Sequence, residues 1–427
     1  MPRAAKLSPK IGRLIVSPRA YEKQRGLFRA FRWLRANNPL GYVEVEGFDP
    51  FWAVTRYPDI LEISRQEDLF HNGDRATTLV PRAADEEIRR LTGGSPHLIR
   101  TLVHMDEPDH LKYRSIVETW FTRQGVRTLE NRIRTIARGF VDAMAARGPE
   151  CDFVRDIAVH YPLRVIMHIL GIPQEDEPLI LKLTQLLFGG EDSELGLQVE
   201  ANNDPARHAK QLVRVFAEFE AYFTCLTEAR RKAPRDDVTS VIANAEIDGA
   251  PIGHLEAMSY CLFLATAGHD TTSSSTSGAI WALCENRREF CKVAADRRLI
   301  PTLIEEAVRW TTPVQHFMRT ATADTELRGR KIAKGDWLML CYLSGNRDEE
   351  AFDRPEHFLV DRKSRNIAFG YGTHVCLGQH LARLEMRIFF EELLERLAWI
   401  EIAGRPRRSA SVFVGGPKTL PVRFRMN

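Results

Sequence analysis

The chain has 427 residues, of which 44% are hydrophobic and 27% charged, and its formal net charge is +3. Such a small net charge argues against a protein that binds nucleic acid. The basic start is followed by only a short apolar run at 14–16, too short for a signal peptide or a membrane anchor. Seven cysteines without a close pair indicate a reducing compartment. We therefore expect a monomeric cytoplasmic protein that does not contact a membrane.

No proline-, glycine- or serine-rich linker and no charge block divides the chain. We expect one domain over residues 1–427, with a flexible N-terminus over about 1–15. Residues 72–98 have no firm period and predict a long loop with a short helix. Helical patterns then dominate from 108 to about 289.

Strand patterns stand near both ends of the chain. Residues 42–47 alternate, and a turn leads into the apolar run 51–55, which predicts a β-hairpin. Further strands are predicted within 317–343, at 412–414 and at 422–424. Helices in the middle with strands at the two ends predict an α+β fold that is mainly α.

The pattern over 259–283 predicts one long apolar helix with a break in its middle. The break is the run Ala267-Gly268-His269-Asp270-Thr271, and these residue types disfavour a helix interior. A local conflict inside a consistent helix often marks a functional site. The alternative is a linker or a phosphorylated serine and threonine run, which apolar helix on both sides disfavours.

Glu306 and Arg309 place opposite charges three residues apart on one predicted helix face. Taken alone, this pattern favours an ordinary surface ion pair, which contributes little to stability.

Cys376 lies between glycines in the loop 369–378, just before a predicted helix. A lone cysteine is usually a small buried apolar side chain. Glycines permit close backbone approach, however, and a helix N-terminus stabilises a thiolate and lowers the thiol pKa. The loop therefore predicts that Cys376 is a metal ligand.

These patterns together resemble the signatures of the cytochrome P450 monooxygenases. Residues 369–378 are similar to the family's haem-binding loop, Phe-x-x-Gly-x-His-x-Cys-x-Gly, and match every fixed position. The resemblance implies one haem-thiolate domain, a helical bundle around haem b with small β-sheets at the edges. Cys376 would be the thiolate ligand of the haem iron. Further loop residues that would bind the haem are His374, at a propionate, with Phe369, Gly370 and Gly378.

Residues 267–271 resemble the family pattern Ala/Gly-Gly-x-Asp/Glu-Thr. The resemblance implies that Ala267 and Gly268 border a groove for dioxygen. It implies that Asp270 and Thr271 are catalytic and supply protons for cleavage of the O–O bond. The 306–309 pattern is similar to the family's buried Glu-x-x-Arg pair, which supports the cysteine loop.

Three further cations are placed at the haem propionates by the resemblance. The segment 105–114 is similar to the family's propionate segment and contributes His110 and Arg114, and Arg319 follows the Glu-x-x-Arg helix. The alternative for each is a solvated surface charge. Glu107 departs from the family pattern, which often has proline there.

Several segments look most like the soluble bacterial branch of the family that hydroxylates alpha-terpineol. This implies a small apolar substrate, either a monoterpenoid or an alkyl-substituted or polycyclic aromatic hydrocarbon. Residues 72–98 and 186–206 would form a variable lid. The residues expected to line the substrate pocket are Phe263, Thr266, Ala267, Val314, Phe317 and Phe413.

The resemblance implies hydroxylation with dioxygen and two electrons. Because no flavin or iron–sulfur segment remains in the chain, the electrons would come from a ferredoxin with its own reductase. Lys112, Arg123 and Arg127 are candidate docking residues. Two alternatives are a peroxide-driven haem-thiolate enzyme, which the Asp270–Thr271 pair disfavours, and a haem-based ligand sensor, for which no output domain is visible.

Overall fold

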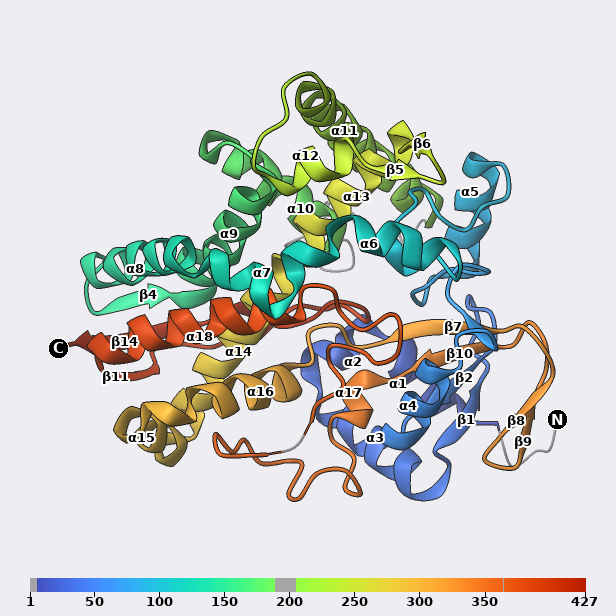
Figure 1. Cartoon of the computed structure of the whole chain (residues 1–427). Coiled ribbons are helices and arrows are strands. Elements are labelled where there is room, and N and C mark those ends of the chain that lie inside the picture. The colour runs from blue at the N-terminus through green and yellow to red at the C-terminus, as the bar shows by residue number, and fades with distance from the viewer. Residues whose placement is uncertain (1–5, 189–204, 364) are drawn as a thin grey trace.

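A computed structural model describes residues 6–188, 205–363 and 365–427. Figure 1 shows a larger, helical part and a smaller part that contains the main sheet and the N-terminal helices. The helices before residue 100 are α1 (Pro9–Val16), α2 (Pro18–Lys23), α3 (Arg25–Asn37), α4 (Tyr57–Arg65) and α5 (Arg82–Thr92). The helices of the middle region are α6 (Asp109–Phe121), α7 (Arg123–Thr128), α8 (Glu130–Ala146), α9 (His160–Leu170), α10 (Glu177–Phe188), α11 (Pro205–Lys232), α12 (Val238–Ala243), α13 (His254–Ala267), α14 (Asp270–Glu285), α15 (Arg287–Ala295) and α16 (Ile300–Thr311). The last two are α17 (Tyr342–Gly345) and α18 (Gln379–Arg396).

The main sheet has the strand order β1-β2-β10-β7-β3, and a three-stranded sheet has the order β11-β14-β4. The remaining strands form the pairs β12-β13, β5-β6 and β8-β9. The strand bounds are β1 (Leu40–Val43), β2 (Phe51–Val54), β3 (Phe70–His71), β4 (Glu150–Asp152), β5 (Glu246–Ile247), β6 (Ala250–Pro251), β7 (Phe317–Ala321), β8 (Thr325–Leu327), β9 (Arg330–Ile332), β10 (Trp337–Leu340), β11 (Leu397–Ile402), β12 (Arg407–Arg408), β13 (Pro417–Thr419) and β14 (Pro421–Met426).

The predicted hairpin is confirmed, because β1 pairs with β2 in antiparallel register, with Leu40 opposite Val54. The predicted strand at 412–414 is wrong. Val414 makes only an isolated bridge with Val314, and the nearest strand is β13. The short apolar run instead packs its side chains beside β7, where Phe413 contacts Phe317.

The N-terminus also differs from the expectation of a flexible segment over about 1–15. Pro9–Val16 forms α1, and the Ser8 hydroxyl caps it by accepting a hydrogen bond from the Ile11 N–H at 3.4 Å. Ile15 is fully buried in the cluster beside the main sheet. Burial of this apolar residue explains why the segment is ordered as a helix. Residues 1–5 lie outside the described residues.

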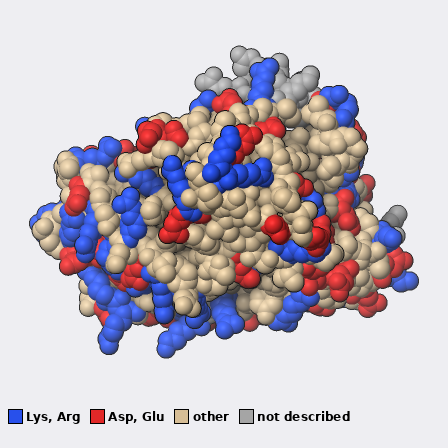
Figure 2. Space-filling view, turned by 45° about the horizontal axis from the view of Figure 1, so that its top comes forward, with Lys and Arg blue, Asp and Glu red and all other residues tan. Residues whose placement is uncertain are grey.

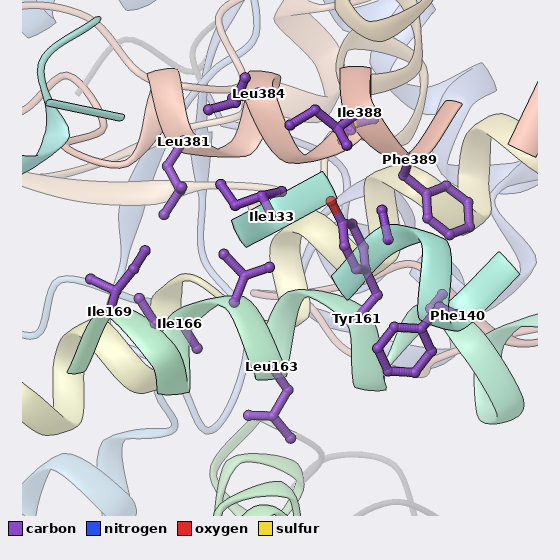
Figure 3. Close-up of a cluster of buried hydrophobic side chains, with 14 of the residues drawn as sticks. Ile133, Phe140, Tyr161, Leu163, Ile166, Ile169, Leu381, Leu384, Ile388 and Phe389 are labelled. Atoms are coloured by element: carbon purple, nitrogen blue, oxygen red, sulfur yellow. The ribbon is translucent and has the colours of Figure 1, made fainter. Parts of the chain in front are cut away.

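Helix α18 crosses the middle of the molecule, and its position fixes the cysteine loop that precedes it (Figure 1). Figure 3 shows Leu381 of α18 pointing toward Ile166 and Ile169 of α9, and Leu384 and Ile388 belong to the same buried cluster. The Tyr161 hydroxyl of α9 points toward α18 and donates a hydrogen bond to the Glu385 carbonyl at 2.9 Å. Apolar packing and this bond hold α18, which begins directly after the cysteine loop.

Candidate active site

The cysteine loop is closed by its own backbone. The Cys376 N–H donates a hydrogen bond to the Phe369 carbonyl at 2.8 Å, and Gly378 caps α18. Gly372 has φ +74°, and a Cβ there would collide with the Ser64 carbonyl of α4. Glycine is therefore required at this position because only a chain without a side chain fits.

Cys376 retains an exposed surface, although packed protein surrounds the thiol on its other sides. Burial raises the Cys376 pKa, against the opposing effects of the Gly378 N–H and the Arg114 and Arg383 cations. The expectation of a lowered thiol pKa is therefore wrong for the protein alone, since desolvation outweighs the helix terminus. A coordinated metal ion would deprotonate the thiol regardless, because its charge dominates the local field. The loop thus fits a thiolate ligand.

Four cationic or proton-donating side chains gather near this loop from three elements. The His110 ring of α6 lies against the His374 ring, with 4.0 Å between the ring centroids. Burial, followed by the positive charge of Arg319, His110 and Arg114, lowers the His374 pKa to about 2. Arg319 of β7 is only 6% exposed and donates to the Met318 carbonyl at 2.8 Å.

No carboxylate of the described residues lies within ion-pair distance of Arg319, and Arg114 is 3.9 Å from the Glu118 carboxylate. Arg319 is a buried cation without an ion pair among the described residues, which is costly unless an anion binds there. The geometry therefore fits the two carboxylates of a haem group, and it places all four predicted propionate residues together.

Glu107, the departure from the family pattern, has a definite role here. Its carboxylate lies 3.1 Å from His110 Nδ1 and accepts a hydrogen bond from the Leu111 N–H at 3.2 Å. Because a carboxylate only accepts, His110 carries its proton on Nδ1. Glu107 therefore orients His110 toward His374.

The Glu306–Arg309 pair of α16 is buried, which excludes the surface ion pair that the spacing alone favours. The two side chains are 0% and 1% exposed and form two parallel hydrogen bonds of 2.7 and 2.8 Å. Arg309 also donates to the Asn346 carbonyl at 2.8 Å, and the Asn346 side chain accepts from the Ile367 N–H at 2.9 Å. This series of hydrogen bonds connects α16 to the segment that leads into the cysteine loop.

Arg362 completes this cluster and is absent from the sequence predictions. Its Nε donates to Glu306 Oε2 at 2.9 Å, so one carboxylate binds two arginines. The partners are 56 residues apart. An arginine in an irregular segment gives no periodic signal, so the sequence pattern does not identify it.

The predicted helix break lies between α13 and α14. The Thr271 hydroxyl donates to the Ala267 carbonyl at 3.0 Å, which consumes a helix acceptor and bends the chain. A Cβ at Gly268 would lie 3.2 Å from the Ile166 side chain of α9, so the Ile166 side chain would have to shift to admit a larger residue. Close packing at Gly268 thus positions the broken turn.

Asp270 opens α14 as a partly buried acid, with its side chain 20% exposed. Burial raises the Asp270 pKa, and the nearby His269 opposes this. Asp270 Oδ2 is buried and has no hydrogen-bond partner among the described residues. An unsatisfied buried carboxyl oxygen is rare in proteins and suits a group that exchanges protons.

A comparison with family models matches residues 83–418 to the family described as Cytochrome P450. The chain belongs to the cytochrome P450 family.

Individual P450 relatives cover nearly the whole chain. "Cytochrome P450-terp" of a Pseudomonas species is 44% identical over 425 residues, which is 99% of each chain. A steroid C26-monooxygenase of Mycolicibacterium smegmatis is 35% identical over 403 residues, 93% of each chain.

Solved P450 structures show the same fold. A crystal structure of a P450 from Novosphingobium aromaticivorans superposes with a TM-score of 0.91 at 43% identity, over 99% of this chain and 100% of that one. A Mycobacterium marinum P450 in complex with pseudoionone gives a TM-score of 0.85 at 33% identity, over 94% and 95%. The chain is therefore a cytochrome P450 monooxygenase with the mainly helical P450 fold, and the family implies haem iron, dioxygen and a redox partner.

The pocket residues predicted for this P450 fall into two groups. Val314, Phe317 and Phe413 come together, since Phe317 and Phe413 have ring centroids 5.4 Å apart and the bridge between Val314 and Val414 joins their segments. Phe263, Thr266 and Ala267 lie on α13. The Thr266 hydroxyl donates to the Leu262 carbonyl at 3.0 Å within its own helix. The polar atom of Thr266 is thereby satisfied, and the set is apolar in character.

The predicted lid segments are described only in part. Residues 72–98 contain α5, as expected for a loop with one short helix, whereas residues 189–204 of the other segment lie outside the described residues.

The surface of the P450 shows basic and acidic side chains mixed over the face in Figure 2, with wide areas of neither. Lys112, one of the predicted docking residues, pairs with Asp248 at 2.6 Å. Arg123 and Arg127 are exposed, and neither forms an ion pair with another described residue. Within the described ranges, no helix is both long enough and apolar enough to cross a membrane.

Proposed function

We propose that this P450 hydroxylates a small apolar substrate, a monoterpenoid or an alkyl-substituted or polycyclic aromatic hydrocarbon. The observation that carries the proposal is the pairing of an intact Asp270–Thr271 proton site with an apolar set around Phe317 and Phe413. An apolar pocket selects by fit, because it offers few polar anchors. The likeness to a P450 solved in complex with pseudoionone supports this class of substrate.

The cofactor of this proposal is haem b. Cys376 would ligate its iron, and Arg319, Arg114, His110 and His374 would bind its propionates. Phe369, Gly370 and Gly378 would shape the loop against the ring, and Ala267 and Gly268 would border its other face. When bound, haem iron supplies the activation of dioxygen.

The protein's own part in the reaction is to exclude water and to move protons. Thr271 holds its hydroxyl at the break, where it can pass a proton onward. Asp270 is a partly buried acid whose raised pKa keeps it protonated to higher pH, so that it has a proton to donate. Glu306 and Arg309 act at a distance by fixing the segment that leads into the cysteine loop. A peroxide-driven enzyme would not need the Asp270–Thr271 pair.

The electron donor of the proposal is an iron–sulfur ferredoxin with its reductase. Its support is the exposed, unpaired state of Arg123 and Arg127 at the start and end of α7, which contacts α18. Exposed cations steer an acidic partner toward a docking face. Lys112 contributes less than the sequence suggests, since Asp248 neutralises it.

The test is a titration of purified holoenzyme with monoterpenoids, alkylbenzenes, polycyclic aromatics and, as a control, charged analogues of each. We expect the apolar compounds alone to shift the haem absorption from low spin to high spin, because they displace water from an apolar site. The Phe413→Ala variant should weaken this response by about tenfold or more through lost ring burial. A shift driven by the charged analogues instead would contradict the proposed substrate class.

A further inference from the structure

His316 is a fully buried histidine directly before β7, and the proposed function assigns it no role. Its ring contacts two segments that are far from it in the sequence. Nε2 lies 2.9 Å from the Leu79 amide nitrogen, in the predicted lid segment 72–98, and Nδ1 lies 3.1 Å from the Val412 carbonyl oxygen. One side chain therefore joins this lid segment to the residues beside Phe413.

The two partners determine where the ring carries its hydrogen. The Leu79 N–H only donates, so Nε2 accepts, and the Val412 carbonyl only accepts, so Nδ1 donates. One neutral tautomer meets both requirements. Burial, which the Val412 contact opposes only in part, lowers the His316 pKa to about 4, so the ring is neutral in its usual working range. Both ring nitrogens are thus satisfied, and the ring has one defined orientation.

Main-chain hydrogen bonds flank His316 on both sides. Toward the lid segment, the Met318 N–H donates to the Thr77 carbonyl at 2.9 Å. Toward the C-terminal residues, the Gln315 N–H donates to the Phe413 carbonyl, also at 2.9 Å. Between these two bonds, the His316 ring adds a side-chain link to each of the same two segments. His316 is therefore the point at which both segments depend on a single side chain.

The ring also contacts Phe413 itself, which lies in the loop 411–415 and which the proposed function places in the substrate pocket. The ring centroids of His316 and Phe413 are 5.7 Å apart at an interplanar angle of 68°, an edge-to-face arrangement. Phe317 makes a similar contact with the same ring at 5.4 Å and 66°. Two aromatic contacts of preferred geometry restrict the orientation of the Phe413 ring.

We infer that His316 is a positioning residue that ties the lid segment 72–98 to the Phe413 loop, residues 411–415, and so sets the width of the pocket between them. A fixed width admits small apolar molecules and excludes larger ones, since a pocket with few polar anchors selects by fit. The inference rests on the proposed function, which places Phe413 and the lid segment at the substrate.

Two substitutions separate the two hydrogen bonds of the ring. His316→Asn places an amide nitrogen near the Nδ1 position, where it can donate to Val412, but the shorter side chain does not reach Leu79. His316→Gln reaches Leu79 with an amide oxygen that can accept its N–H, but it has no donor at the Nδ1 position. The matched control for the lid bond is Gln315→Ala, because the Gln315 side chain donates to the Ser411 carbonyl at 2.8 Å and so binds the same loop without the lid.

The first readout is hydrogen–deuterium exchange of the Leu79 amide in holoenzyme without substrate. We expect this exchange to be about tenfold faster in His316→Asn, because a buried amide loses its hydrogen bond. His316→Gln and Gln315→Ala should keep the wild-type rate. An unchanged rate in His316→Asn would overturn the inference, because the lid segment would then be held without the ring.

The second readout is the ratio of the spin-shift affinities for a small and a large apolar probe, p-cymene and pyrene. The wild type should prefer p-cymene, and His316→Asn should reduce this preference by about three- to tenfold, because the lid segment can move outward. His316→Gln should reduce it as well, since it releases the Phe413 loop, and it carries the test if His316→Asn does not bind haem. A loss of affinity by the same factor for both probes would overturn the inference, because it would assign the ring to packing alone.

The failure of the proposed function gives a different result. If the wild type shows no spin-state shift with any apolar compound, the proposed substrate class is wrong, and the Leu79 exchange rate alone then decides whether His316 ties the two segments. If the wild type responds to p-cymene but the ratio is the same in His316→Asn, the substrate class stands and the positioning role of His316 is contradicted.

Discussion

Two regions of the molecule differ in how their buried charged groups are partnered. One is the cluster that supports the cysteine loop, and the other is the break between α13 and α14. Each charged atom of Glu306, Arg309 and Arg362 has a partner, and the Glu306 carboxylate binds both arginines and the Leu359 N–H. At the break, Asp270 keeps a buried oxygen without a partner. The first arrangement is rigid because removing any member exposes an unpaired charge. In the second arrangement the Asp270 carboxyl keeps an unpaired oxygen that can exchange a proton, and such unpaired titratable groups are typical of functional sites.

The largest expected effect comes from breaking the scaffold. Arg309→Ala leaves Glu306 buried with only Arg362 as a charged partner, and we expect a loss of about 3–5 kcal/mol in the free energy of unfolding with a fall in haem content. Arg309→Lys should also destabilise, because lysine cannot form two parallel bonds. Denaturant titration and haem quantification are the measurements.

The matched control is Arg298→Ala, which removes an exposed pair with Asp296 and should leave both measurements unchanged. Wild-type stability in Arg309→Ala would show that the buried pair does not support the loop.

Removing the hydroxyl at the break should change chemistry with little change in stability. Thr271→Ala should lower product formed per reductant consumed by about tenfold or more, with peroxide released, because positioned proton donors typically contribute ~10²–10⁴ in rate. Thr276→Ala, whose hydroxyl bonds the Thr272 carbonyl at 2.8 Å, removes an equivalent group five residues away and should remain coupled. A wild-type yield of product per reductant consumed in Thr271→Ala would contradict the catalytic assignment.

The smallest effect is a pH dependence of stability caused by Asp270. Its pKa is raised in the folded protein, so the native state binds more protons than the unfolded chain above about pH 4. The stability of the wild type relative to Asp270→Asn should therefore fall as pH rises from about 4 to the raised pKa, and then level off. Denaturant titrations of both proteins across this range test the sign. A difference that grows with pH would mean that Asp270 is stabilised as an anion.

Local patterns in the sequence identify the parts of the site whose partners are close along the chain. The cysteine loop, the Glu306–Arg309 spacing and the helix break are all of this kind, and the structure places the four predicted propionate residues together. The contacts that join distant segments, such as Arg362 to Glu306 and His269 to Val159, carry no periodic signal. The ordered N-terminus was missed for a related reason, since α1 is ordered by the burial of Ile15 in the cluster beside the main sheet.

The central claim is that Cys376, held by the Glu306–Arg309–Arg362 cluster, ligates the haem iron as a thiolate. The most direct test is the difference spectrum of reduced protein with and without carbon monoxide, recorded for the wild type and for Cys376→Ser. We predict the red-shifted band of a thiolate-ligated haem in the wild type and its loss in the variant, with Cys341→Ser as a buried control that keeps it. A wild-type spectrum typical of histidine ligation, or an unchanged band in Cys376→Ser, would contradict the claim.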